Sequence, residues 1–126
     1  MQDTIARLKN MEELAENVYK EAAEAFKDDA DFHAFLSLLS EQEAQHVEFM
    51  ADLAERMATL DSRAEEAILL TQETQDRLEA PVRAARERIA TGRLSKKELI
   101  EDIVATESSE WNHIFVYVVN TAQQNL

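Results

Sequence analysis

This chain contains only one glycine, Gly92, and one proline, Pro81, in 126 residues. A sheet of short strands needs frequent turns, and glycine and proline are the residues on which turns depend. Good helix formers such as Ala, Glu, Leu, Gln and Arg dominate instead. Hydrophobic residues make up 45 % of the chain, which is enough for one core, and charged residues make up 31 %, which is enough for a solvated surface. We therefore predict an all-α fold in a single domain that spans residues 1–126.

Polar and turn-forming residues divide the chain into four periodic stretches. Asp29 or Asp31 is the expected N-cap of the second stretch. Gly92 suits the position after the C-terminus of the third, because glycine accepts a positive φ there. Ser95 and Glu98 have the spacing of a capping box at the start of the fourth. The predicted helices are 3–27, 31–58, 62–91 and 95–123, which together make a four-helix bundle.

Cysteine is absent, and this excludes disulfides, thiolate nucleophiles, iron–sulfur clusters and zinc–thiolate sites. The 26 acidic residues outnumber the 13 basic residues and give a net charge of −13. Such a charge repels nucleic acid and anionic membrane surfaces, so neither is an expected partner. No apolar run is long enough to span a bilayer, and the first residues lack the layout of a signal peptide. We expect a cytoplasmic protein whose metal ligands, if any, are oxygen and nitrogen atoms.

Ionisable residues interrupt the apolar face of three of the four predicted helices. Helical spacing places Glu12 on the inward face of the first helix, and Glu43 with His46 on that of the second. In the fourth helix it places Glu110 and His113 there. A buried carboxylate costs roughly several kcal/mol unless it is paired or binds something. Antiparallel folding brings these groups to one depth of the bundle, so we expect them to converge.

Two segments, 43–46 and 110–113, have the pattern Glu-x-x-His. Residues three apart project from one face of a helix, so the carboxylate and the imidazole can hold one metal ion together. One such pair arises by chance in a highly charged helical chain, whereas two on inward faces, with a further inward glutamate, indicate a metal site. This is the arrangement found in the bundle core of di-iron and di-manganese carboxylate proteins. We predict a non-haem di-iron site, with manganese as the alternative metal.

Two segments carry a more specific pattern. In residues 12–19 a glutamate is followed seven positions later by Tyr19, and residues 41–46 read Glu-Gln-Glu-Ala-Gln-His. Both resemble the ferritin-like superfamily, and its rubrerythrin branch most of all. The resemblance implies a ferritin-like bundle with ferroxidase chemistry or reduction of O2 or peroxide, iron handling and an external electron donor. It also implies Tyr19 as a hydrogen-bond partner of the ligands. The metal ligands that it implies are Glu12, Glu43, His46, Glu110 and His113.

Two departures from that family concern the third helix. The family takes a carboxylate from it, but no acid lies on its predicted inward face. Glu79 lies as far before Glu110 in the chain as Glu12 lies before Glu43. This repeated spacing selects Glu79 as the fourth carboxylate. The family also joins its second and third helices by a long crossover. Here either the stretch 58–70 makes that crossing, or the third helix packs antiparallel to the second or against another subunit. The family's rubredoxin-type module cannot be present, because the chain has no cysteine.

Several alternatives stay open. Glu16 competes with Glu12 for the inward position of the first helix, and Glu107 competes with Glu110 in the fourth. The functional alternative is a helical dimerisation or interaction module without metal, in which the inward acids pair with histidine. A third interpretation keeps the metal in a mononuclear site, or in one shared between subunits. A homo-oligomer, at least a dimer, is expected, because large apolar side chains crowd residues 115–119.

Overall fold

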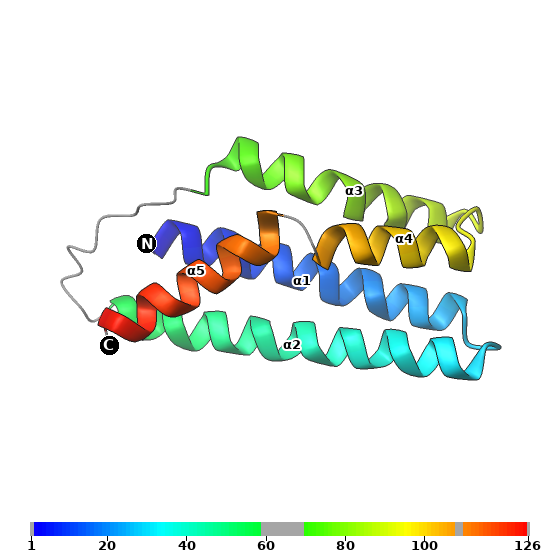
Figure 1. Cartoon of the computed structure of the whole chain (residues 1–126), viewed down its shortest axis with the longest axis horizontal. Helices are drawn as coiled ribbons and strands as arrows, with labels where there is room; N and C mark the ends of the chain where they lie inside the picture. Colours follow the sequence, from blue (N-terminus) through cyan, green and yellow to red (C-terminus); the bar gives the residue numbers. More distant parts are fainter. Residues whose placement is uncertain (1, 59–69, 108–109, 126) are drawn as a thin grey trace.

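The computed structural model describes residues 2–58, 70–107 and 110–125, without the side chains of residues 2, 57, 58, 110, 121–123 and 125. These ranges hold helices and no strand, which confirms the all-α prediction (Figure 1). Among them, no helix is at once long and apolar enough to cross a membrane. The helices are α1 (Gln2–Ala25), α2 (Ala30–Ala58), α3 (Gln72–Ala90), α4 (Lys96–Glu107) and α5 (Glu110–Asn125).

The antiparallel hairpin of α1 and α2 has the most extensive helix–helix contact in the described part of the chain. Asp29 closes its turn: Oδ1 of Asp29 accepts a hydrogen bond from the backbone N–H of Phe32 at 3.2 Å. Asp29, rather than Asp31, is therefore the residue that caps α2. The fully buried apolar side chains of the hairpin are Ile5, Leu8, Met11, Ala22, Leu36 and Met50. Close packing of these side chains holds the two helices in one relative register.

α3 begins at Gln72, because the Thr71 side chain accepts a hydrogen bond from the N–H of Thr74 at 3.2 Å and so caps the helix. The sequence predicts a helix from residue 62, but residues 59–69 lie outside the described ranges. At the other end Gly92 has a φ of +69°, and the N–H of Arg93 donates back to the carbonyl of Arg88 at 2.8 Å. A left-handed glycine of this kind ends a helix, as predicted for Gly92.

The order of the helices is up-down-up-down. α2 ends and α3 begins at the same end of the bundle, so α3 runs antiparallel to α2 and parallel to α1 (Figure 1). α3 packs against α1, and α4 returns alongside α3. This order needs no connection along the length of the bundle, which differs from the long crossover of the ferritin-like family. Of the topologies that the sequence leaves open, the structure shows the antiparallel one.

Where the sequence predicts one fourth helix, the structure has two helices, α4 and α5, with different directions (Figure 1). The buried apolar side chains are Leu99 and Ile103 in α4, and Trp111, Ile114 and Val118 in α5. The sequence places Glu110 and His113 on the inward face, whereas the buried residues are the next ones along the chain, Trp111 and Ile114. The inward face of α5 is therefore displaced by one position from the predicted one. This displacement decides which side chains of α5 approach the centre of the bundle.

Candidate metal centre

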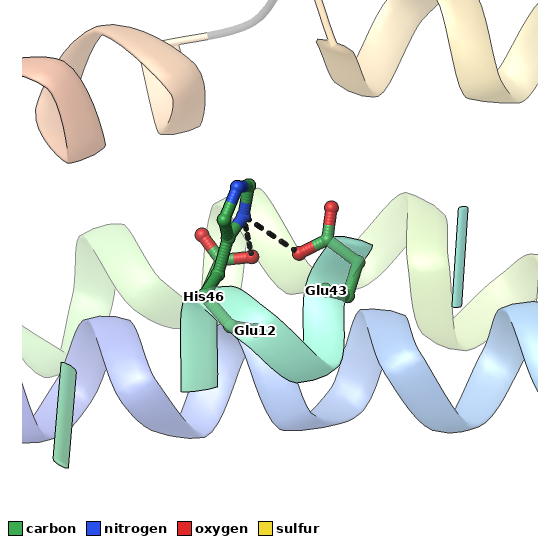
Figure 2. Close-up of side chains that lie close together, drawn as sticks. All are labelled: Glu12, Glu43 and His46. Carbon is green, nitrogen blue, oxygen red and sulfur yellow. Dashed lines mark ion pairs between the residues drawn. The ribbon is translucent and has the colours of Figure 1, made fainter. Parts of the chain in front are cut away.

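Three ionisable side chains meet between the two helices of the hairpin. Glu12 comes from α1, and Glu43 and His46 come from α2, each with a ligand atom within 4.8 Å of the other two. Figure 2 shows Nδ1 of His46 between the two carboxylates, 3.5 Å from Oε2 of Glu12 and 3.4 Å from Oε2 of Glu43. The i, i+3 spacing puts the two α2 residues on one face, and the hairpin register sets Glu12 opposite them. The structure thus brings three of the predicted ligands to one point.

The three side chains differ in burial. Glu12 is 3 % and Glu43 is 7 % exposed, whereas the side chain of His46 is 38 % exposed. Oε2 of Glu43 and Nδ1 of His46 are both buried, yet neither has a hydrogen-bond partner within the described ranges. An unpaired buried polar atom costs about 1–3 kcal/mol, so such atoms usually have an explanation in function or in a bound ion.

Burial and ion pairing act in opposite directions on these groups. Burial raises the pKa of Glu43 to about 8, and the adjacent Glu12 carboxylate adds to this against the effect of His46. The carboxylate of Glu12, and after it that of Glu43, raises the pKa of His46 to about 10. Burial would also raise the pKa of Glu12, but the nearby His46, together with the contact with Glu43 and the hydrogen bond from Trp111, holds that pKa below its ordinary value. Near neutral pH, His46 and Glu43 thus carry protons that a metal ion would displace.

α4 and α5 supply the remaining walls of the site. Nε1 of Trp111 donates a hydrogen bond to Oε1 of Glu12 at 3.2 Å, so the indole fixes the orientation of that carboxylate. The ring of Phe115 lies 4.5 Å from the imidazole of His46, measured between ring centroids. The resulting hollow opens to solvent, and the space inside it that a water-sized molecule can reach is about 20 Å³. Its lining residues are Glu12, Ala15, Tyr19, Glu43, His46, Thr106, Glu107, Trp111, Asn112 and Phe115.

Tyr19 stands in the same hollow, two helical turns after Glu12 on α1. Its hydroxyl donates a hydrogen bond to Oε1 of Glu107 at 3.5 Å. Burial, followed by the negative charge of Glu107, raises the pKa of the Tyr19 phenol, which therefore stays protonated and acts as a donor. The family resemblance implies Tyr19 as a hydrogen-bond partner of the ligands, and the partner in the structure is Glu107.

Glu79, the fourth carboxylate predicted from the sequence, is only 2 % exposed on α3. Its carboxylate accepts hydrogen bonds from Arg83 at 3.2 Å and from Gln75 at 3.5 Å. Arg7 on α1 donates in turn to Gln75 at 3.4 Å. Glu79 therefore belongs to a polar network that joins α3 to α1, and it is absent from the lining of the hollow.

The second Glu-x-x-His pair occupies a different environment from the first. His113 is exposed on α5, and the side chain of Glu110 lies outside the described residues. Trp111, which lies between them in the chain, faces the bundle instead. On α1, Glu16 pairs with Lys20 at 3.8 Å, while Glu12 belongs to the group that could hold a metal ion.

Trp111 is a site residue that the sequence analysis does not find. The signal for it is a second apolar row in the fourth predicted helix, in which Trp111 is followed at helical spacing by Ile114 and Val118. To choose the row of Trp111 over the row of Glu110, one must know that the predicted fourth helix is divided into α4 and α5. The periodicity within α4 or within α5 does not reveal this.

No family model, curated protein or solved structure matches this chain. The resemblance to ferritin-like proteins therefore depends on residues 12–19 and 41–46 alone. The structure itself establishes an all-α bundle with a buried Glu-Glu-His group that could hold a metal ion. Two carboxylate oxygens and one imidazole nitrogen suit iron, manganese or zinc better than soft copper(I). The buried atoms of Glu43 and His46 that have no hydrogen-bond partner among the described residues fit such an ion.

Proposed function

We propose that this chain binds a transition-metal cation, iron before manganese, through Glu12, Glu43 and His46. The observation that carries the proposal concerns two buried atoms, Oε2 of Glu43 and Nδ1 of His46, which lie 3.4 Å apart and have no hydrogen-bond partner in the described part of the chain. Two groups that exist only to stabilise a fold would share a proton in good hydrogen-bond geometry. A cation coordinated by both atoms satisfies them together, and the Glu12 carboxylate completes a three-sided set of donors.

The walls of the hollow support the same function. Trp111 holds one oxygen of Glu12 and leaves the other, Oε2, facing His46. Hydrogen bonds of this kind orient metal ligands and tune their basicity. Phe115 covers one face of the imidazole of His46 and limits its rotation. The net charge of −13 attracts cations to the molecule as a whole.

The finer proposal is a non-haem di-iron protein of ferritin or rubrerythrin type, with ferroxidase activity or reduction of O2 or peroxide. It is supported by the glutamate–tyrosine spacing of residues 12–19 and the Glu-x-x-His of residues 43–46. When bound, an iron pair supplies electrons for reducing O2 or peroxide, and an external donor restores them. The residues of this chain hold the ligands in place and leave one side of the hollow open to a small molecule.

Anaerobic loading with Fe(II) tests the proposal. The wild type is expected to bind iron, and Glu43→Gln, which keeps the shape but removes the charge, is expected to bind about a hundredfold more weakly. Glu41→Gln is the matched control, because Glu41 is an exposed acid on the same helix and is expected to leave binding unchanged. Two irons per chain and a near-UV band after exposure to O2 support the di-iron proposal. One iron per chain indicates a mononuclear site, and one iron per two chains a site shared between subunits. No binding by the wild type contradicts the proposal.

A metal-free interaction module is the second candidate, favoured by apolar side chains on the outer face of α2. Phe35, Leu38 and Phe49 are 45 %, 51 % and 41 % exposed, at helical spacing along one side of the helix. A second copy of the chain would bury them. This candidate predicts a dimer that Leu38→Asp dissociates, measured by sedimentation equilibrium, and no difference in metal content between the wild type and Glu43→Gln.

A further inference from the structure

The outer side of α2 carries a continuous row of exposed residues at alternating spacings of three and four, here called the outer row. Figure 1 shows α2 along one edge of the bundle. Three members of the row are large apolar side chains, and the others are polar or charged. In a coiled coil, a row with this spacing is the line along which one helix packs against another. The outer row consists of Asp31, Phe35, Leu38, Gln42, Gln45, Phe49, Asp52 and Arg56.

The outer row is self-complementary when two copies of α2 run antiparallel. About a two-fold axis that passes between residues 43 and 44, Leu38 faces the partner's Phe49, and Gln42 faces the partner's Gln45. The two-fold axis repeats each contact, so two apolar contacts lie on either side of two glutamine pairs. A polar pair inside an apolar seam fixes the alignment of two helices at some cost in stability.

The charges of the outer row favour the antiparallel arrangement over a parallel one. In a parallel pair each residue faces its own copy, so Asp31, Asp52 and Arg56 would each oppose a like charge. In the antiparallel pair Asp31 faces the partner's Arg56 at both ends of the row. Within one chain, Nε of Arg56 lies 3.3 Å from Oδ2 of Asp52. Each guanidinium would then lie between two carboxylates, with Phe35 packed beside them.

The apolar contacts select one register of the antiparallel pair. A shift of one heptad in either direction sets Leu38 against the partner's Gln42 or the partner's Arg56. Either shift leaves no apolar member of the outer row facing another apolar member. The register with Leu38 against the partner's Phe49 therefore buries the most apolar surface among these three.

We propose that two copies of this chain dimerise through the outer row, as an antiparallel pair of α2 helices in this register. The proposal rests on the exposed apolar side of α2 that favours the second candidate function, and it holds with or without a bound metal. Glu43 points away from the outer row and belongs to a group with Glu12 of its own chain. Dimerisation therefore leaves one candidate metal centre inside each chain.

Disulfide cross-linking tests the orientation and the register, because the chain has no cysteine of its own. Leu38→Cys and Phe49→Cys are purified separately and mixed in a glutathione redox buffer without metal. The proposal predicts a cross-link between the two variants, since their thiols face one another while the second Leu38–Phe49 contact stays intact. Within either variant alone the two thiols lie roughly 16 Å apart along the helix axis, too far for a disulfide. Mass spectrometry separates mixed from self-linked dimers, and a majority of self-linked dimers overturns the antiparallel arrangement.

A charge reversal beside the outer row tests the register without removing any contact. Glu41 and Glu48 are exposed next to the row, and in this register Glu41 faces the partner's Glu48. Glu48→Lys turns two repelling pairs into attracting ones, so it is expected to tighten dimerisation about tenfold in sedimentation equilibrium. The matched control is Glu101→Lys, the same change at an exposed acid on α4, which is expected to have a much smaller effect. Equal tightening in both variants overturns the register.

The outcomes separate this proposal from the metal-binding function. The wild type is expected to dimerise with a micromolar dissociation constant, and a monomer at millimolar concentration overturns the proposal. Leu38→Asp is expected to be monomeric, to keep its helices by circular dichroism, and to bind manganese(II) as the wild type does. A dimer that persists in Leu38→Asp also overturns the proposal. A dimeric wild type that binds no metal contradicts the metal-binding function and leaves the dimer in place.

Discussion

The two Glu-x-x-His segments of this chain have the same spacing and different environments. In α2, Glu43 is 7 % exposed and faces Glu12 across the helix hairpin. In α5, His113 is exposed, and the neighbouring Trp111 takes the inward position. The sequence pattern alone does not distinguish them, since both fall on apolar rows at helical spacing.

The difference follows from how each helix is held. α2 packs along its length against α1, and buried side chains on both sides of Glu43, such as Leu36 and Met50, determine which face points inward. α5 follows a change of direction after α4, and its inward face is displaced by one position. A motif on a helix therefore indicates a site only where the core fixes the rotation of that helix.

The largest expected effect tests whether the core fixes the rotation of α2. Leu36 is fully buried and Leu38 is 51 % exposed, two positions apart on the same helix. Leu36→Ala is expected to lower the free energy of unfolding by about 2–5 kcal/mol, because it leaves a cavity in the core. Leu38→Ala, the matched control, is expected to change it by less than about 1 kcal/mol. Urea denaturation measures both, and similar losses would mean that α2 presents a different face.

The second prediction compares the two histidines directly. His46→Ala is expected to weaken manganese(II) binding about a hundredfold, because it removes one of the proposed ligands. His113→Ala is expected to leave the affinity unchanged, since its side chain is exposed on α5. Isothermal titration calorimetry gives both affinities. An equal loss in the two variants would restore the second Glu-x-x-His pair as part of the site.

A third prediction concerns the contribution of α5 to the site. Trp111→Phe removes the hydrogen bond to Oε1 of Glu12 and keeps an aromatic ring in the core. Metal affinity is expected to fall about tenfold, the usual effect of losing a group that orients a ligand. Tyr117→Phe, a half-buried change on the same helix, is the control. An unchanged affinity in Trp111→Phe would limit α5 to a structural role.

The smallest expected effect is the pH dependence of the metal-free protein. The pKa is raised from 4.5 to about 8 for Glu43 and from 6.5 to about 10 for His46, so the two shifts have the same sign. Each gives stability that is present at low pH and is lost as the pH rises through the folded-state value. With metal removed by a chelator, the melting temperature is therefore expected to fall between pH 6.5 and pH 9. The slope is expected to be shallower in Glu43→Gln, and an equal slope would contradict the assignment.

Much of the fold follows from local signals in the sequence. The shortage of glycine and proline predicts helices. Gly92 and Ser95 can be predicted to mark helix ends, because each acts only on the backbone groups next to it in the chain. The grouping of Glu12 with Glu43 and His46 follows from the spacing within each helix and from the short turn that joins them. Those constraints all act over a few residues or across one hairpin.

The remainder depends on tertiary packing. Phe35 lies three helical turns before His46, on the same side of α2, but is 45 % exposed, while Leu36 beside it is fully buried. Glu79 is buried, yet it is engaged by Arg83 on its own helix, which periodicity does not reveal. The displaced face of α5 depends on the change of direction between helices. Local periodicity carries no information on any of these contacts.

The most direct test of the central claim uses the three histidines of the chain, His33, His46 and His113. Their imidazole nitrogens give separate signals in a long-range ¹H–¹⁵N NMR spectrum, and zinc(II) serves as a diamagnetic probe. Metal binding through the α2 residues predicts that zinc(II) shifts the signals of His46 alone, from a doubly protonated to a metal-bound imidazole. Shifts at His113, or no shift at His46 with saturating zinc(II), would contradict it.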